Sequence, residues 1–284
     1  MKHPLSTMVR QAARLALTLA ALAWGVAATA QPTAPLLFAV SEGTSGGGSA
    51  VTDEQMATKY RPVVEVMERV LGQKITVRYV RDFRMLEDGM KNARFDLVIA
   101  RPSDYPARGL RDYGYNVVTT TQPDGHCLLV VKEDSPFKTL DEMKGKRFIL
   151  PEQIAYMTKF CLAELRDHGL PLTPGEVTFV REQGAIPFAL KNNLSHIGGI
   201  ASYSGVAGRL QKEGLRVLHK SRPQPYLPLI AGARIPADKV RELGAELVAL
   251  SKTEQGAKAL AAIGLKGFDT NSQQRLLELL AETG

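Results

Sequence analysis

Arg101 is the residue of this sequence best suited to bind an anion. It follows the apolar segment FDLVIA (95–100), which has the composition of a buried strand, and it precedes Pro102. A guanidinium at the carboxyl end of a strand can form two parallel hydrogen bonds with a carboxylate or a phosphonate group. The alternative is a structural ion pair with Asp104 or another nearby acid. Arg101 is therefore a candidate ligand-binding residue.

The turn in ILPEQIAYMTKFCLAEL (149–165) is a second candidate, because this segment predicts a strand end, a turn and a helix start. Backbone N–H groups and the dipole at a helix start attract anions. The turn lacks a glycine-rich loop and a Ser/Thr cluster. Tyr156 either faces the ligand or packs its ring within the protein, while Met157 fits a core position. The candidate binding residues of the turn are Gln153, Ala155 through its backbone, Tyr156 and Thr158.

Hydroxyl groups also follow the first apolar segment, APLLFAV (34–40). Ser41 and Thr44, with Ser45 beside them, lie in a stretch rich in glycine and serine and could donate hydrogen bonds to a ligand. The same composition fits a flexible surface loop. Both interpretations stay open for Ser41 and Thr44.

The first thirty residues have the pattern of a secretory signal. A basic start precedes an apolar run that ends in small residues, so we expect cleavage after Ala30 and an exported protein; an uncleaved anchor is the alternative. The chain has 36 Lys+Arg and 29 Asp+Glu, and loss of the three basic residues of the signal leaves +4 (33 minus 29). These charges are interspersed rather than clustered with aromatic residues, which argues against nucleic acid as a partner.

Cys127 and Cys161 are the only cysteines. In an oxidising compartment they could form one disulfide, or they could be two separate buried thiols, since Cys161 lies on the apolar seam of its predicted helix. The sequence has no C-x-x-C motif, no haem-attachment motif and no histidine pair at metal-ligand spacing. We therefore expect no cofactor and no metal site.

Strands alternate with helices along most of the chain, which indicates α/β layers with mostly parallel sheets. Ligands of such sheets gather at the carboxyl ends of the strands. The segment QPDG (122–125) is expected to separate two strands, and YSGVAGRLQKEG (203–214) is expected to be helical. Three further helices are predicted after residue 236, at 237–252, 253–264 and 272–282.

Three stretches resemble the periplasmic phosphate/phosphite/phosphonate-binding proteins of ABC importers, which belong to the type 2 periplasmic binding protein superfamily. They are YRPVVEVMERVLGQKITVRYVRDFRMLEDGMKNARFDLVIARPSDY (60–105), EDSPFKTLDEMKGKRFILPEQ (133–153) and SRPQPYLPLIAGARIPADKVRELGAELVAL (221–250). The resemblance implies an α/β fold, a bilobed clamshell whose two lobes are joined by two crossover strands. Lobe 1 would comprise 35–121 and 225–284, and lobe 2 would comprise 122–224, with the ligand between them.

The same resemblance marks further site positions. Phe83 matches a family aromatic that would form an apolar wall, although core packing is an alternative, and Tyr105 lies four residues beyond the family's tyrosine position. A family histidine falls near Gln183, one family acid falls near Ala201 or Ser202, and a family aspartate falls near Tyr226 or Leu227. Because a buried ammonium group needs a paired charge, the missing acids imply a ligand without a cationic tail.

We therefore expect a solute-binding protein of a phosphonate-type ABC importer that is monomeric and without catalytic activity. It would bind a small phosphonate-like or carboxylate anion by closure of its lobes and then dock on a membrane permease. A sensing partner of a membrane histidine kinase is the alternative. An enzyme with Cys127 or Cys161 as nucleophile would need an exposed thiolate beside a base, and the histidines stand in no catalytic motif.

Overall fold

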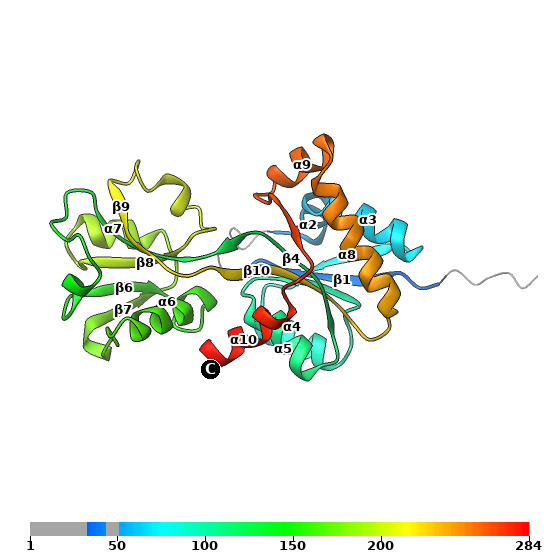
Figure 1. Ribbon diagram of the computed structural model, residues 1–284, viewed down its shortest axis with the longest axis horizontal. Coiled ribbons are helices and arrows are strands. Elements are labelled where there is room, and N and C mark those ends of the chain that lie inside the picture. Colours follow the sequence, from blue (N-terminus) through cyan, green and yellow to red (C-terminus); the bar gives the residue numbers. More distant parts are fainter. Residues whose placement is uncertain (1–32, 44–50, 284) are drawn as a thin grey trace, which may run out of the picture. The chain divides into compact units, whose positions relative to one another are not determined.

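The computed structural model describes residues 33–43 and 51–283. Within these ranges, residues from Pro35 onward form one compact unit that contains two mixed β-sheets (Figure 1). No helix in the described ranges is long and apolar enough to cross a membrane. The expected signal segment (1–30) and the candidate residues Thr44 and Ser45 lie outside them.

The first sheet has the strand order β11-β4-β10-β3-β1-β2. β1 pairs in parallel with β2 and β3, whereas β10 is antiparallel to β3 and β4, and β11 is antiparallel to β4. The prediction of mostly parallel sheets is therefore wrong, because β10 re-enters this sheet from its opposite end. The strands are β1 (Leu36–Ser41), β2 (Ile75–Tyr79), β3 (Leu97–Ala100), β4 (Asn116–Gly125), β10 (Gln224–Ala231) and β11 (Gly267–Asp269).

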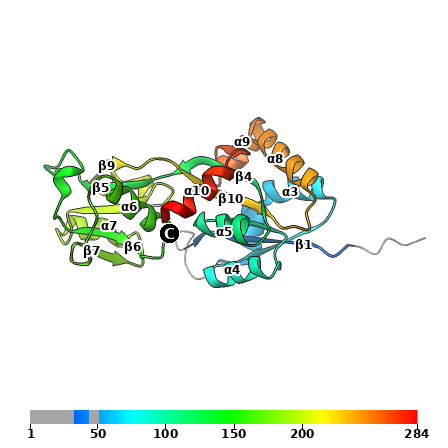
Figure 2. The same ribbon diagram turned by 60° about the horizontal axis from the view of Figure 1, so that its bottom comes forward.

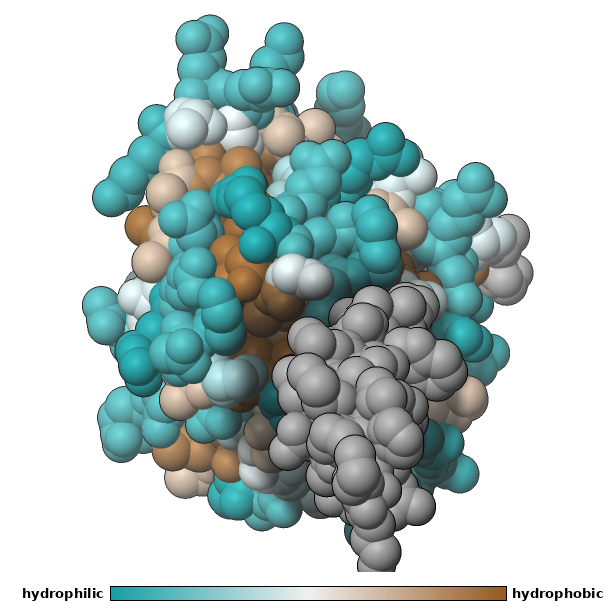
Figure 3. All heavy atoms as spheres, turned by 90° about the vertical axis from the view of Figure 1, so that its right-hand side faces the viewer, coloured by the Kyte–Doolittle hydropathy of each residue, from teal (hydrophilic) through white to brown (hydrophobic). Residues whose placement is uncertain are grey.

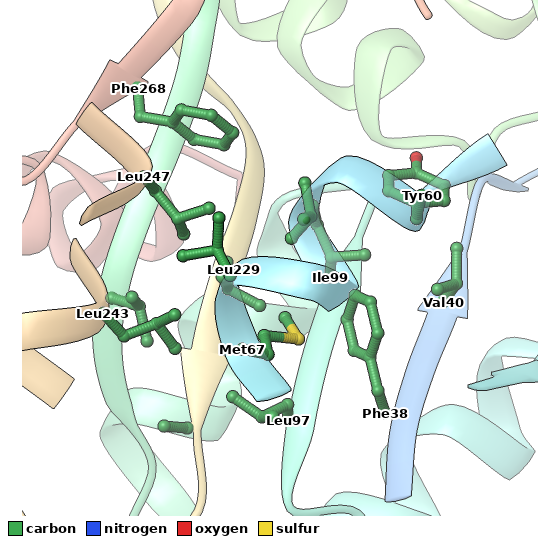
Figure 4. Packing of buried hydrophobic residues seen from close by; sticks show 14 of the residues in the cluster. Phe38, Val40, Tyr60, Met67, Leu97, Ile99, Leu229, Leu243, Leu247 and Phe268 are labelled. Atoms are coloured by element: carbon green, nitrogen blue, oxygen red, sulfur yellow. The ribbon is translucent and has the colours of Figure 1, made fainter. Parts of the chain in front are cut away.

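Helices cover both faces of the first sheet, because its strands are apolar on both sides. Phe38 and Val40 pack toward α3 and α8, as Figure 4 shows, while Ala39 between them joins the cluster toward α4. On the face drawn in Figure 3, most protruding side chains are hydrophilic and the hydrophobic ones lie recessed between them. The helices are α2 (Asp53–Lys59), α3 (Arg61–Leu71), α4 (Phe83–Lys91), α5 (Asp104–Asp112), α8 (Ala237–Ser251), α9 (Glu254–Ala261) and α10 (Gln273–Thr283).

The second sheet has the order β7-β6-β8-β5-β9 and is also mixed. Leu129 faces the cluster that contains α6, and Leu128 and Val130 face the cluster that contains α7, so apolar alternation again buries both faces. The elements are β5 (Cys127–Lys132), β6 (Phe148–Pro151), α6 (Tyr156–Asp167), β7 (Val177–Val180), α7 (Ala185–Lys191), β8 (Ile197–Ala201) and β9 (Leu215–Lys220), with 3-10 turns at Asp141–Met143, Pro174–Glu176 and Ala207–Arg209.

Two connections join the sheets, as the two expected crossover strands require. β4 leads into β5 through His126, and β9 leads into β10 through residues 221–223. In Figures 1 and 2, α10 lies along α5 near the start of α6. Leu276 and Leu279 of α10 share an apolar cluster with Cys127 of β5. The C-terminal helix therefore packs against the second sheet as well as against α5, which covers the first sheet. The exact lobe boundaries remain a prediction.

Two local predictions differ from the structure, and α5 has no counterpart among the expected helices. Its single proline, Pro106, lies in the first helical turn, where no intrahelical N–H bond is lost. The expected helix at 203–214 is reduced to the 3-10 turn at 207–209, consistent with the low helix propensity of its glycines. β4 continues through QPDG to Gly125 instead of ending before it, with a cis peptide bond before Pro123.

Candidate functional site

A small pocket with a cavity volume of about 30 Å³ lies where strands of both sheets end, and it opens to solvent. This is the carboxyl edge at which α/β sheets hold ligands. The wall on the side of the first sheet consists of Glu42, Gly43, Phe83, Arg101 and Pro102. The wall on the side of the second sheet consists of Pro151, Glu152, Ala155, Tyr156, Met157, Gln183 and Tyr203. We call these the first wall and the second wall.

The second wall contains the N-terminus of α6. Ala155 is the N-cap residue with extended backbone (φ −64°, ψ 134°), and no side chain caps the helix. The first turn carries no acidic residue, so the positive end of the helix dipole is not neutralised by its own helix. Thr158 is not a ligand donor here, because its buried hydroxyl donates to Pro151 O at 3.1 Å. The donors that this wall could offer an anion are therefore the backbone N–H groups of the first turn.

Tyr156 supplies a second polar group on the same wall. Its side chain is 2% exposed, and its hydroxyl has no hydrogen-bond partner among the described residues. Burial raises the pKa of Tyr156 well above its usual value, so the hydroxyl remains a donor at physiological pH. A buried hydroxyl without a partner is unfavourable. Tyr156 thus lines the pocket while its ring packs in the core, whereas the sequence left these as alternatives.

Arg101 lies at the first wall and is fixed by neighbours. Its Nε donates to Glu42 O at 2.8 Å, and one terminal nitrogen donates to the Tyr226 hydroxyl at 2.5 Å. The other terminal nitrogen is 3.7 Å from Glu42 Oε2. Burial opposes the charge of Arg101, but Tyr226 and Glu42 outweigh burial and raise its pKa. The structural ion pair of Arg101 is therefore with Glu42 and not with Asp104.

Glu42 is the polar residue of the first wall that the sequence reading missed. Its side chain is 2% exposed, and Oε1 accepts hydrogen bonds from Lys59 Nζ at 2.5 Å and from the Tyr60 hydroxyl at 2.7 Å. Burial favours the neutral acid, yet Arg101, Lys59 and Tyr60 together lower the pKa of Glu42. An acid that directly follows an apolar strand, as in AVSEG, was the available signal. Glu42 is thus an ionised group held by the first wall.

Aromatic rings line and support the pocket. Tyr203 stacks on Tyr226 with ring centroids 4.5 Å apart, and the guanidinium of Arg101 lies 5.4 Å from the Tyr203 ring centre. Phe83 lines the pocket and stacks on Tyr105 at 5.1 Å, so Tyr105 supports Phe83 from behind. The sequence reading selected Ser202 and missed its neighbour Tyr203, which joins the two walls because it contacts residues of the first sheet.

The remaining candidates are distributed around this pocket. Gln183 lines it, and its Oε1 accepts a hydrogen bond from Ala201 N at 3.1 Å. Ser202 accepts from His126 N at 2.9 Å, behind the pocket. Ser41 is fully buried at the end of β1, and Gln153 is exposed; neither belongs to the lining. Thus Phe83, Arg101, Ala155, Tyr156 and Gln183 line one pocket, and the other described candidates surround or lie outside it.

A disulfide joins Cys127 of β5 to Cys161 of α6, with an S–S distance of 2.04 Å. The alternative of two separate thiols is therefore wrong, and the buried position expected for Cys161 is confirmed. Neither cysteine is a free thiol, so the hypothesis of a cysteine nucleophile loses its reactive group. The bond links the middle of α6 to β5 of the second sheet, and the first turn of the same helix lines the pocket.

No group of metal ligands gathers at this pocket within residues 33–43 and 51–283. The one cluster of His, Cys, Asp or Glu side chains found there that could share an ion is Glu164, His168 and His219, at the opposite end of α6. The pocket itself is lined by the start of α6, one arginine, two tyrosines, one glutamine, apolar surface and two acids, Glu42 and Glu152, that are paired with cations. This combination suits an oxyanion with an uncharged remainder.

Known proteins resemble this chain in sequence and in fold. The family model described as "ABC transporter, phosphonate, periplasmic substrate-binding protein" matches residues 49–276, whereas none of the curated proteins matches the sequence. The fold is similar to XAC2383 from Xanthomonas citri bound to ATP (TM-score 0.65, 17% identity, 87% of this chain and 96% of that chain). It is also similar to PhnD1 from Prochlorococcus marinus in complex with methylphosphonate (TM-score 0.65, 11% identity, 87% and 97%). A histidine kinase sensor domain with similarity to periplasmic binding proteins is a further structural neighbour (TM-score 0.53, 13% identity, 83% and 99%).

Proposed function

Because the chain belongs to the family of periplasmic substrate-binding proteins of phosphonate ABC transporters, we propose that it binds a small phosphonate-like or carboxylate anion between its two sheets. In this proposal the loaded protein delivers the anion to a membrane permease. The N-terminal segment (1–30) would direct export to the periplasm, and the protein would act as a monomer.

The observation that carries the proposal is the meeting of the uncapped α6 N-terminus with Arg101 at one pocket. Two of the five N–H groups of Arg101 donate hydrogen bonds within the protein, which leaves donors for a ligand oxygen. An oxyanion between Arg101 and the first turn of α6 would receive charge-assisted hydrogen bonds from both walls. Tyr156 would add its hydroxyl.

Ligand binding would favour closure of the two halves. A ligand favours one conformation only by its higher affinity for that conformation, and in the closed one the ligand would contact both walls. Contacts also link the two halves. Tyr203 stacks on Tyr226, and Lys159 of α6 lies 3.6 Å from the buried Asp104 of α5. In this proposal the closed arrangement keeps these contacts and the anion adds to them.

The uncharged part of the ligand would face Phe83, Pro102 and Met157. The acids of the lining already have cationic partners: Glu42 pairs with Lys59 and Arg101, and Glu152 lies 3.5 Å from Arg181. A cationic tail on the ligand would compete with these partners. We therefore propose a ligand without such a tail.

A second function is a ligand-sensing partner of a membrane histidine kinase. The structural similarity to a kinase sensor domain favours it, and closure would have the same physical basis. Co-purification with detergent-solubilised permease or kinase separates the two: retention of the loaded protein by the permease supports transport, and retention by the kinase alone supports sensing.

The test of the ligand class is a thermal-shift series with phosphate, phosphite, methylphosphonate, aminoethylphosphonate and acetate. A ligand that binds the folded state alone raises the melting temperature by mass action. We expect a shift with methylphosphonate or a carboxylate and a smaller one with aminoethylphosphonate. A larger shift with aminoethylphosphonate would contradict the proposed lack of a cationic tail, and no shift with any anion would overturn the proposed function.

A further inference from the structure

We propose that Glu164, His168 and His219 form a binding site for a divalent transition-metal ion of the zinc type, separate from the anion pocket. Glu164 lies in the last turn of α6, His168 is the C-cap residue of that helix, and His219 lies near the end of β9. The sequence reading expected no metal site because the two histidines are 51 positions apart (219 minus 168). Only the fold brings them together.

The spacing of the ligand atoms supports the proposal. Glu164 Oε1 lies 3.2 Å from His168 Nε2 and 3.0 Å from His219 Nε2. Two atoms bound at about 2.0–2.1 Å to a tetrahedral zinc ion stand about 3.3–3.4 Å apart. The three atoms all lie within 4.8 Å of one another. The His168 side chain is 47% exposed, so it can rotate to close the separation between the two imidazoles.

The ligand types fit the same class of ion. Two imidazoles and one carboxylate form a set that zinc accepts, with a water molecule completing the coordination. Hard ions such as Mg²⁺ prefer oxygen ligands alone. The site should therefore discriminate between Zn²⁺ and Mg²⁺.

The surroundings can hold an added positive charge. Three acids and two arginines surround the site. Arg222 lies 3.7 Å from Glu164, 2.8 Å from Asp167 and 3.8 Å from Glu282. Arg166 lies 3.2 Å from Asp167. One acid is thus in excess when the histidines are neutral (three minus two). The site also lies at the C-terminus of α6, where the helix dipole favours cations.

The remaining carboxylate oxygen of Glu164 has a partner that would orient it. Arg222 Nε approaches Glu164 Oε2 at 3.7 Å, while the side chain of Glu164 is only 6% exposed. A buried carboxylate held from behind points its other oxygen at the two imidazoles. A bound ion would connect the end of α6 to the strand that enters the crossover into β10.

Isothermal titration of the full, tag-free chain with Zn²⁺ tests the site, with melting temperature recorded with and without the ion. We expect one Zn²⁺ per chain, a rise in melting temperature and no binding of Mg²⁺. His168→Gln and His219→Gln should each weaken Zn²⁺ binding by at least about tenfold. The matched control is His196→Gln, a histidine directly before β8 and outside the cluster, which should bind as the original protein does.

Cobalt supplies a second readout that a surface ion would not give. Co²⁺ bound by this set should show the visible absorption of a four-coordinate centre, and His219→Gln should abolish it. Absence of Zn²⁺ binding to the original protein would overturn the proposal. Equal Zn²⁺ binding by His168→Gln and His219→Gln would overturn it as well, because the ion would then lie elsewhere. Equal binding of Mg²⁺ would indicate a nonspecific electrostatic contact and would also overturn it.

Discussion

The two walls of the pocket differ in how far their polar groups are already satisfied. In the first wall, Arg101 and Glu42 bind each other and are further held by Tyr226, Lys59 and Tyr60. In the second wall, the N-terminus of α6 is uncapped and the Tyr156 hydroxyl lacks a partner among the described residues. The charged groups of the first wall are thus held in place by protein partners. The second wall instead has hydrogen-bond donors without protein partners, to which a ligand could bind.

Loss of the disulfide should have the largest effect on the second wall. The bond closes a 34-residue separation, for which chain entropy predicts roughly 4 kcal/mol of stabilisation. The double variant Cys127→Ser/Cys161→Ser should lose about that free energy of unfolding, measured by urea denaturation. Reduced original protein serves as the control and should match the variant. Equal stability of the oxidised original protein and the variant would show that α6 is held by packing alone.

Glu42→Gln should weaken the first wall by nearly as much. It leaves Arg101 and Lys59 without a buried counter-charge, which we expect to cost about 3 kcal/mol, the low end for a broken buried pair because Lys59 is one-third exposed. Since the folded-state pKa of Glu42 is lowered, its contribution is present above the unfolded pKa and is lost as pH falls through the folded one. The variant should therefore lose part of the acid sensitivity of urea unfolding. Unchanged stability and pH dependence would show that the network is not structural.

Ala155→Asp should affect stability and binding in opposite directions. An aspartate at the N-cap would cap α6 and raise stability by roughly 1 kcal/mol, while its charge would weaken anion binding by about tenfold. Ala155→Ser is the matched control, because it caps without charge and should weaken binding less. Titration calorimetry and urea unfolding measure the two effects. Undiminished anion affinity in Ala155→Asp would place the ligand away from the helix start.

Tyr156→Phe should have the smallest effect. Removal of a buried hydroxyl without a protein partner should leave stability unchanged or slightly higher, whereas loss of one hydrogen bond to the ligand should weaken binding by about fivefold. Thermal unfolding and titration calorimetry measure both. A clear loss of stability with unchanged affinity would mean that the hydroxyl serves the protein and not the ligand.

The sequence predicted the elements that bury apolar residues on a regular period, including β1, β3 and α6, because burial imposes that period. It also placed Arg101 and the start of α6 at the site, since both follow strands that end at one edge. It missed Glu42 and Tyr203, whose roles depend on partners far away in the chain, Lys59 and Tyr226. It also missed α5 for a local reason, because Pro106, which suits a first helical turn, is equally common in loops.

The most direct test of the proposed site compares Arg101→Ala with Arg84→Ala by titration calorimetry, using the anion that gives the largest thermal shift. Arg84 is exposed on α4 next to Phe83, so both variants remove one positive charge near the pocket. Loss of charged hydrogen bonds predicts binding about ten- to a hundredfold weaker in Arg101→Ala and nearly unchanged in Arg84→Ala. Arg101→Lys, which keeps the charge without the fork, should be intermediate. Unchanged affinity in a folded Arg101→Ala protein would contradict the account.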